Sequence, residues 1–138
     1  MKPIIVICGL SGSGKTFSSK ILEKELENYK VIGPGIKRQQ LGITHYSRKD
    51  TPKLLAKIIE EIENNQDPEQ GFILDANLKS VDLRQSFYDL AKHLNINLVI
   101  IETFCSDETA TKRMARRERP TLAENPTESI IYHNQKRV

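Results

Sequence analysis

A strand pattern runs directly into a glycine-rich segment and then into a helical pattern, and this order limits the fold more than any other feature. Ile4–Cys8 is a continuous apolar run rich in β-branched residues, as in a strand buried on both faces of a parallel sheet. Residues 9–16 read GLSGSGKT, and apolar positions recur at helical spacing from Lys15 onward. Further strand and helix patterns alternate along the chain, so the predicted fold class is α/β, with a parallel sheet covered by helices on both faces.

The glycine-rich segment matches the pattern G-x-x-x-x-G-K-[ST], whose backbone N–H groups surround phosphate oxygens. Lys15 supplies a cation for the β- and γ-phosphates, and Thr16 supplies a hydroxyl ligand for Mg²⁺. A flexible Gly–Ser turn is the alternative, but the flanking strand and helix favour a phosphate loop. The residues expected to bind a nucleoside triphosphate are Gly9, Leu10, Ser11, Gly12, Ser13, Gly14, Lys15 and Thr16.

The remaining elements follow from periodicity and from residues that start or stop helices. Gly33-Pro34-Gly35 is expected to end regular structure, with at most a brief helical turn over residues 36–41. Thr51, Ser80 and Ser106 are expected to cap helices, and Pro120 to end the helix after Ser106. The predicted strands cover residues 29–32, 72–74 and 98–101, and the predicted helices cover residues 51–64 and 80–94, with a last helix from residue 125.

Size and composition indicate one ordinary globular unit. A chain of 138 residues fits a single domain over residues 1–138, and a net charge of +3 does not require a nucleic-acid partner. The longest apolar run, Ile4–Cys8, is far shorter than the roughly 20 residues that span a bilayer, so we expect a cytoplasmic protein without a membrane partner. Cys8 and Cys105 have no neighbours at metal-ligand spacing and are expected to be buried, reduced thiols.

Asp75 directly follows the strand pattern Phe72–Leu74. If that strand lies beside the phosphate loop, its carboxylate can hold a water bound to Mg²⁺ or orient a nucleophile. An Asp at the end of a strand is also a common turn or cap residue. The phosphate loop favours the first interpretation.

A basic stretch follows Ser106. Arg113, Arg116 and Arg117 fall on or near one helical face, from which a guanidinium could reach a transferring phosphoryl group. The alternative is a solvent-exposed basic face paired with Glu118 and Asp107. For an isolated charged helix the solvent-exposed face is favoured, and the phosphate loop leaves both interpretations open.

Beyond the phosphate loop, four further segments strengthen one resemblance: residues 71–78 (GFILDANL), Arg84, residues 90–92 and residues 112–117. Together they resemble the small P-loop kinase family that includes the kinase domain of bacteriophage polynucleotide kinase, with chloramphenicol phosphotransferase and zeta-toxin-type kinases as more distant relatives. Asp75-Ala76-Asn77-Leu78 looks like the Asp-Thr-Asn-Leu segment of that family.

This resemblance implies roles for several residues. Asp75 and Asn77 would lie beneath the phosphates, Arg38 and Arg84 would bind the acceptor, and Arg113 with Arg117 would belong to a lid over ATP. It also implies a three-layer P-loop fold with strand order 2-3-1-4. Relatives place a fifth strand beyond the lid, and none is evident before Val138, so either the sheet is shortened or the C-terminal part is missing.

One position departs from the family pattern. Relatives carry an Asp three residues before an Arg after the second strand, where it accepts the proton of the acceptor hydroxyl, whereas this chain has Gly35 before Arg38. Asp75 and Asp50 are the alternative carboxylates. The Gly is also compatible with a backbone that needs a positive φ after Pro34.

The expected function is ATP-dependent phosphoryl transfer to a hydroxyl of a nucleic-acid end, a nucleoside or another small molecule, with ATP and Mg²⁺ as cofactors. Lys15 and Thr16 would bind Mg²⁺·ATP, Asp75 would organise the metal site, and Arg113 or Arg117 would stabilise transition-state charge. A nucleic-acid end is a possible acceptor but is not required. A nucleotide-binding regulatory module without transfer and an NTP hydrolase are the alternatives, and the acceptor and oligomeric state stay open.

Overall fold

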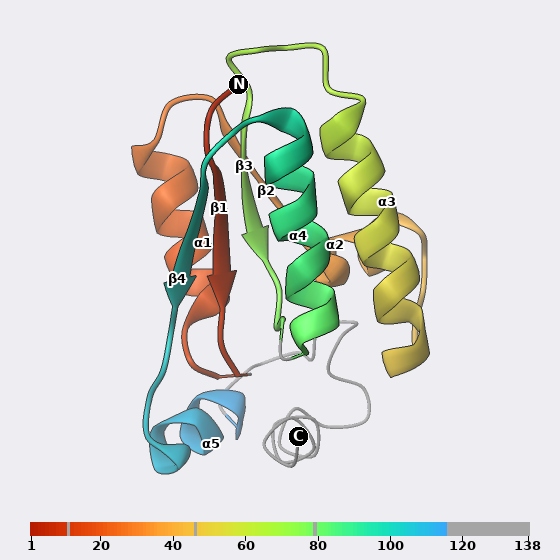
Figure 1. Ribbon diagram of the computed structural model, residues 1–138. Helices are drawn as coiled ribbons and strands as arrows, with labels where there is room; N and C mark the ends of the chain where they lie inside the picture. Colours follow the sequence, from red (N-terminus) through yellow and green to blue (C-terminus); the bar gives the residue numbers. More distant parts are fainter. Residues whose placement is uncertain (11, 46, 79, 116–138) are drawn as a thin grey trace.

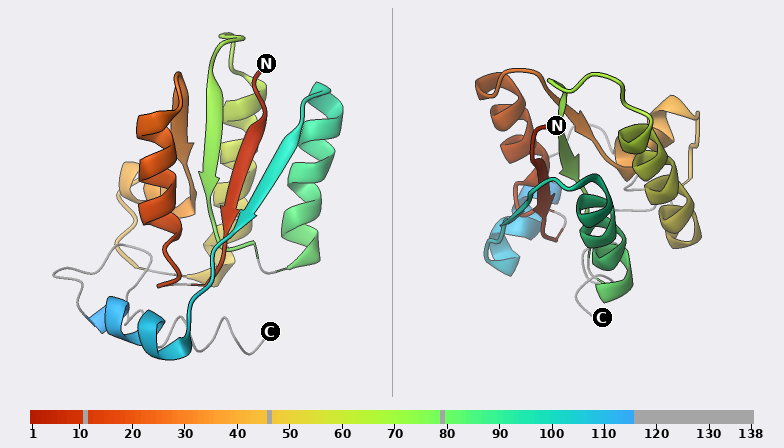
Figure 2. Two further views of the ribbon diagram at one scale, coloured as in Figure 1. Left: turned by 90° about the vertical axis from the view of Figure 1, so that its left-hand side faces the viewer. Right: turned by 45° about the horizontal axis from the view of Figure 1, so that its top comes forward.

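Four parallel strands form one sheet whose order is β2-β3-β1-β4 (Figure 1). The structure is a computed structural model that describes residues 1–10, 12–45, 47–78 and 80–115. Helix α1 covers one face of the sheet, while α3 and α4 cover the other (Figures 1 and 2). The α/β class, the helices on both faces and the predicted strand order are therefore confirmed. The strands are β1 (Ile4–Cys8), β2 (Tyr29–Ile32), β3 (Gly71–Asp75) and β4 (Leu98–Glu102), and the α-helices are α1 (Lys15–Glu25), α2 (Pro34–Gln40), α3 (Thr51–Glu63), α4 (Val81–Leu94) and α5 (Asp107–Ala115), with a short 3₁₀ helix at Arg48–Asp50.

Strand β1 lies inside the sheet between β3 and β4. Ile4 pairs with Phe72 on one side and with Leu98 on the other, and this register brings Ile7 level with Asp75. The apolar side chains of β1 and β3 pack against α3 and α4 and exclude water, which is the main source of stability in such a core. The fully buried residues of this core include Ile4, Ile58, Ile62, Leu74 and Phe87.

The prediction for Gly33-Pro34-Gly35 is wrong. Helix α2 begins at Pro34, because Pro at the first helical position loses no intrahelical hydrogen bond and its fixed φ suits a helix. Gly35 is therefore a helical residue in the first turn, with right-handed backbone angles, and the proposed need for a positive φ there is also wrong.

The predicted helix caps have mixed outcomes. The Ser80 hydroxyl accepts a hydrogen bond from the backbone N–H of Leu83, and the Ser106 hydroxyl accepts one from Thr109, each at 3.1 Å. Thr51 is the first residue of α3 rather than its cap, and Asp50 precedes the helix without a side-chain cap bond. The predicted stop at Pro120, the last helix and any fifth strand lie outside the described residues.

Helix α3 is tied to its neighbours through Glu61. Its carboxylate forms ion pairs with Lys30 of β2 and Lys37 of α2. Burial alone would raise the pKa of Glu61, but hydrogen bonds from the two ammonium groups lower it below the ordinary value. This cluster joins α3, α2 and β2.

Within the described part of the chain, no helix has the length and apolar character needed to cross a membrane.

Candidate functional site

The carboxyl ends of β1, β3 and β4 lie at one edge of the sheet, where the glycine-rich loop leaves β1 and enters α1 (Figure 1). Ligands of open parallel sheets bind in the crevice at such an edge, because the loops after the strands converge there. Most residues discussed below belong to, or directly follow, one of these strands or the helix after it. The fold therefore defines one candidate site.

The loop backbone requires glycine at two positions in particular. Gly9 has a φ of 148°, and a Cβ atom there would lie 2.4 Å from the carbonyl oxygen of Thr103. Gly14 has a φ of 102° and precedes α1 without a side-chain cap. The N-terminus of an 11-residue helix, with its positive partial charge, thus stands directly at the end of this glycine-rich loop. Ser11 lies outside the described residues.

Lys15 folds back over the loop that precedes it. Its ammonium group donates a hydrogen bond to the carbonyl oxygen of Leu10 at 3.1 Å. This contact holds a positive charge above the loop backbone, where phosphate oxygens of a nucleotide would lie. The geometry therefore fits the role predicted for Lys15.

Thr16 and Asp75 meet at the start of α1. The Thr16 hydroxyl donates to Asp75 Oδ2 at 2.9 Å, and the buried Ser19 hydroxyl lies 3.4 Å from the same oxygen. A hydroxyl oxygen can coordinate Mg²⁺ while its proton still donates to a carboxylate. The structure thus brings together the two residues expected at the metal. A hydroxyl and a carboxylate are oxygen ligands, the kind that Mg²⁺ takes when phosphates and water complete its coordination.

Residues 103–105, directly after β4, wrap around the phosphate loop. The Thr103 hydroxyl lies 2.7 Å from that of Ser13 and donates to the Cys8 carbonyl at 3.3 Å, while its backbone N–H donates to the same carbonyl at 2.8 Å. The Cys105 thiol donates to the Gly12 carbonyl at 3.4 Å. The loop is thereby held from the side opposite Asp75.

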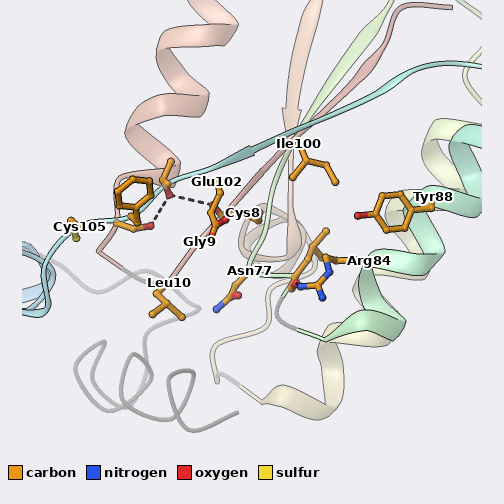
Figure 3. Close-up of a pocket in the computed structure, with 13 residues that line it drawn as sticks. Cys8, Gly9, Leu10, Asn77, Arg84, Tyr88, Ile100, Glu102 and Cys105 are labelled. Atoms are coloured by element: carbon orange, nitrogen blue, oxygen red, sulfur yellow. Dashed lines mark hydrogen bonds between the residues drawn. The ribbon is translucent and has the colours of Figure 1, made fainter.

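A pocket of about 460 Å³ adjoins the phosphate loop. Asn77 and Arg84 extend into it from the segment after β3 and from the first turns of α4, and Tyr88 lies one turn further along α4 (Figure 3). The guanidinium of Arg84 donates to the Leu78 carbonyl at 3.0 Å. The pocket is lined by Cys8, Gly9, Leu10, Ser13, Asn77, Leu78, Arg84, Tyr88, Ile100, Glu102, Thr103, Phe104 and Cys105.

Both cysteines are free thiols, as predicted. The prediction that they are buried is wrong, because each is only partly buried and lines this pocket. Cys8 ends β1 and Cys105 lies just after β4, where the edge of the sheet opens onto this pocket. Partial burial raises the pKa of the Cys8 thiol, and the negative charge of Glu102 raises it further. Arg84 and Lys15 oppose this shift, so three charged groups lie within electrostatic reach of one thiol.

Arg38 is 2% exposed. Its Nη2 donates to the Thr51 hydroxyl at 3.0 Å and to the Ser47 carbonyl at 3.5 Å, which joins α2 to the start of α3. Contact between Arg38 and an acceptor stays a prediction. The side chain of Arg113, on α5, and all of Arg116 and Arg117 lie outside the described residues, so their role as lid residues also stays a prediction.

Sequence reasoning missed Thr103, Glu102 and Tyr88. Glu102 ends β4 as Asp75 ends β3, so the rule applied to Asp75 could have identified it. Tyr88 follows Arg84 by one helical turn, a spacing that places both on one face. Thr103 had no sequence signal, because its partner Ser13 is 90 positions away.

Comparisons with known proteins agree with this geometry. A family model described as an AAA domain matches residues 4–137. No curated protein matches the sequence significantly. Among solved structures, Chaetomium thermophilum Kti12 in complex with ADP-AlF3 is 22% identical with a TM-score of 0.71, and the match covers 97% of this chain and 78% of that one.

Two kinases share the fold as well. A gluconokinase from Sinorhizobium meliloti 1021 is 20% identical with a TM-score of 0.64, over 98% of this chain and 73% of that one. The Mycobacterium tuberculosis APS kinase CysC, in complex with AMPPNP and APS, is 19% identical with a TM-score of 0.65, over 83% of this chain and 69% of that one. The fold is therefore that of P-loop NTPases, while the resemblance to polynucleotide kinase stays a prediction.

Proposed function

This chain belongs to the AAA domain family, and on that premise we propose that it binds Mg²⁺·ATP through its phosphate loop and transfers the γ-phosphoryl group to an acceptor hydroxyl. In this reaction the acceptor oxygen forms a bond to the γ-phosphorus, the bond to the β–γ bridging oxygen breaks, ADP leaves, and the hydroxyl proton passes to a base or to solvent. The similarity in fold to a gluconokinase and an APS kinase supports the proposal.

The observation that carries this proposal is the 2.9 Å hydrogen bond between Thr16 and Asp75. Thr16 and Asp75 would hold Mg²⁺, which would supply positive charge to the β- and γ-phosphates. Lys15, held over the loop by its bond to Leu10, would bind the same phosphates. Phosphoryl transfer depends mainly on such positioning and charge, and these residues are already assembled.

The other predicted residues complete the proposal. Asn77 and Arg84 would contact the acceptor in the pocket, and Arg113 with Arg117 would close over ATP and meet the charge that develops during transfer. A single domain over residues 1–138 and a cytoplasmic location remain predictions, which limited proteolysis and cell fractionation would test.

Gly35 favours a second candidate, a nucleotide-binding module without transfer. The resemblance to polynucleotide-kinase-like proteins predicts a carboxylate at this position, and a general base contributes about 10²- to 10⁴-fold to rate. Its loss would leave binding intact while slowing transfer.

Measuring ADP formation with and without hydroxyl acceptors distinguishes these functions. Acceptor-dependent ADP supports a kinase, acceptor-independent ADP supports a hydrolase, and nucleotide binding without turnover supports a module.

Calorimetric titration with Mg²⁺·ATP should show strongly weakened binding for Lys15→Ala but not for Lys20→Ala, which removes an exposed charge from the same helix. Equal affinities in both variants would contradict the proposed phosphate site.

A further inference from the structure

The side-chain amide of Asn77 is a buried hydrogen-bond donor beside the pocket. Its Nδ2 is buried, and it has no hydrogen-bond partner among the described residues. An amide NH₂ group only donates, and a buried donor without a partner costs free energy comparable to a lost hydrogen bond. Asn77 lines the pocket, so a small rotation of its side chain lets this amide donate to a ligand bound there.

Arg84 adds a positive charge to the same pocket. It is half-buried, and the bond from its Nη1 to the Leu78 carbonyl restrains the guanidinium at the pocket wall (Figure 3). A guanidinium pairs with carboxylate and phosphate oxygens through parallel N–H donors. Together, the cation and the amide donor form a site that suits an anionic group.

The rest of the pocket limits how much negative charge a ligand can carry. Glu102 contributes a carboxylate to the lining, which repels additional anionic groups and accepts hydrogen bonds from hydroxyls. Ile100 and Tyr88 form an apolar surface suited to a carbon skeleton or a ring. A volume of about 460 Å³ lies within the usual range for small-molecule sites.

We propose that the phosphoryl acceptor is a small molecule with one anionic group, a carboxylate or a phosphate, which Arg84 and Asn77 bind while Glu102 faces its hydroxyls. This inference rests on the proposed phosphoryl transfer. The pocket is lined in part by Gly9, Leu10 and Ser13 of the phosphate loop, so a molecule bound there would lie beside the expected γ-phosphate. A polyanionic nucleic-acid strand is disfavoured by the carboxylate of Glu102.

The anion site can be tested without turnover. The full chain, labelled with ¹⁵N and saturated with Mg²⁺ and a non-hydrolysable ATP analogue, is titrated with inorganic phosphate and separately with acetate. We expect a saturable shift of the Asn77 side-chain NH₂ signals, which are identified by their absence in Asn77→Asp. The shift should be lost in Arg84→Gln and retained in Lys92→Gln, which removes an exposed charge from the same helix.

The response to the two probes also identifies the anion. A response to phosphate alone indicates a phosphorylated acceptor, and a response to acetate alone indicates an acid. Signals that stay unmoved by both probes, or that respond equally in Arg84→Gln and Lys92→Gln, would overturn the proposal. Failure of the ATP analogue to bind would instead count against the proposed function, and the anion titrations without nucleotide would still test this site.

Turnover provides the second test. ADP formation is measured with D-gluconate against D-glucose, with ribose 5-phosphate against ribose, and with an oligonucleotide bearing a 5′-hydroxyl. We expect the anionic member of at least one pair to have a KM about tenfold or more below that of its neutral partner, and Arg84→Gln to abolish this difference. Preference for the oligonucleotide or equal use of both members would contradict the inference, whereas ADP formation that no acceptor stimulates would contradict the kinase function itself.

Discussion

The hydroxyl groups of Thr103 and Ser13 lie 2.7 Å apart and join the segment after β4 to the phosphate loop. Ser13 is 8% exposed, so this contact is largely shielded from water. The backbone N–H of Thr103 is separately bonded to the Cys8 carbonyl, and this bond does not depend on the side chain. The Thr103 hydroxyl can therefore be removed while the path of the backbone is preserved.

Thr103→Val should weaken Mg²⁺·ATP binding by about tenfold, because a buried hydroxyl of the loop loses its partner at a cost of roughly 1–3 kcal/mol. Valine keeps the branched shape of threonine. Thr103→Ser keeps the hydroxyl and should bind nearly as well as wild type. Calorimetric titration measures both affinities, and similar affinities in Thr103→Val and wild type would show that the loop holds its shape without this contact.

Gly35→Asp should raise acceptor-dependent turnover by up to about 10²-fold, because it places a carboxylate where the resemblance to polynucleotide-kinase-like proteins predicts one. Gly35 lies in the first turn of α2, where an Asp also interacts favourably with the helix dipole, so Tm should not fall. Gly35→Ala is the matched control, since it adds a Cβ without a carboxylate. If Gly35→Asp is stable and binds nucleotide yet transfers to no acceptor, the kinase proposal loses to the binding-module alternative.

Arg113→Ala and Arg117→Ala should lower kcat more than they weaken ATP binding, because groups that meet developing charge act mainly in the transition state. Lys112→Ala is the control, since Lys112 is exposed on α5 and pairs with Glu108 at 3.0 Å. Steady-state kinetics with an active acceptor, together with ATP titrations, separate the two effects. Unchanged kcat in both arginine variants would support the solvent-exposed basic face.

Acid should destabilise the protein in part through Glu61. Because Lys30 and Lys37 lower its pKa in the folded state, its contribution is fully present above the ordinary value of 4.5 and is lost as pH falls through the lower folded pKa. Thermal melts from about pH 6 to about pH 3 should therefore show a smaller loss of stability in Glu61→Gln than in wild type. Glu60→Gln, at an exposed neighbouring position, should behave like wild type, and parallel curves for all three proteins would refute the assignment.

Most of the fold was predictable from local patterns. The apolar runs of β1, β2 and β4 and the helical faces of α3 and α4 match the observed elements within a few residues, because periodicity reflects which side chains each element buries. The error at α2 arose because Pro34 was treated as ending regular structure, although proline is well suited to the first helical position.

The phosphate loop was predictable because its chemistry is local. Its glycines, Lys15 and Thr16 act through a backbone that turns within a few residues, so the linear order encodes the arrangement. The position of Asp75 could be predicted with one further inference, since a residue that ends a parallel strand next to β1 must lie at the same edge of the sheet. For these residues, the sequence by itself determined the candidate site.

The pocket, and the contacts of residues 103–105 with the phosphate loop, were decided by the tertiary structure alone. Thr103 meets Ser13 across 90 residues and Cys105 meets Gly12 across 93, and such distances leave no periodic trace in the chain. The Asn77 amide has no hydrogen-bond partner in the part of the chain that the structure describes, and this became evident only once packing had withdrawn the amide from water. Contacts of this kind depend on how the strands align in the sheet and on how α4 packs against it. These arrangements form only when the whole core has folded, so they cannot be predicted from the local order of residues.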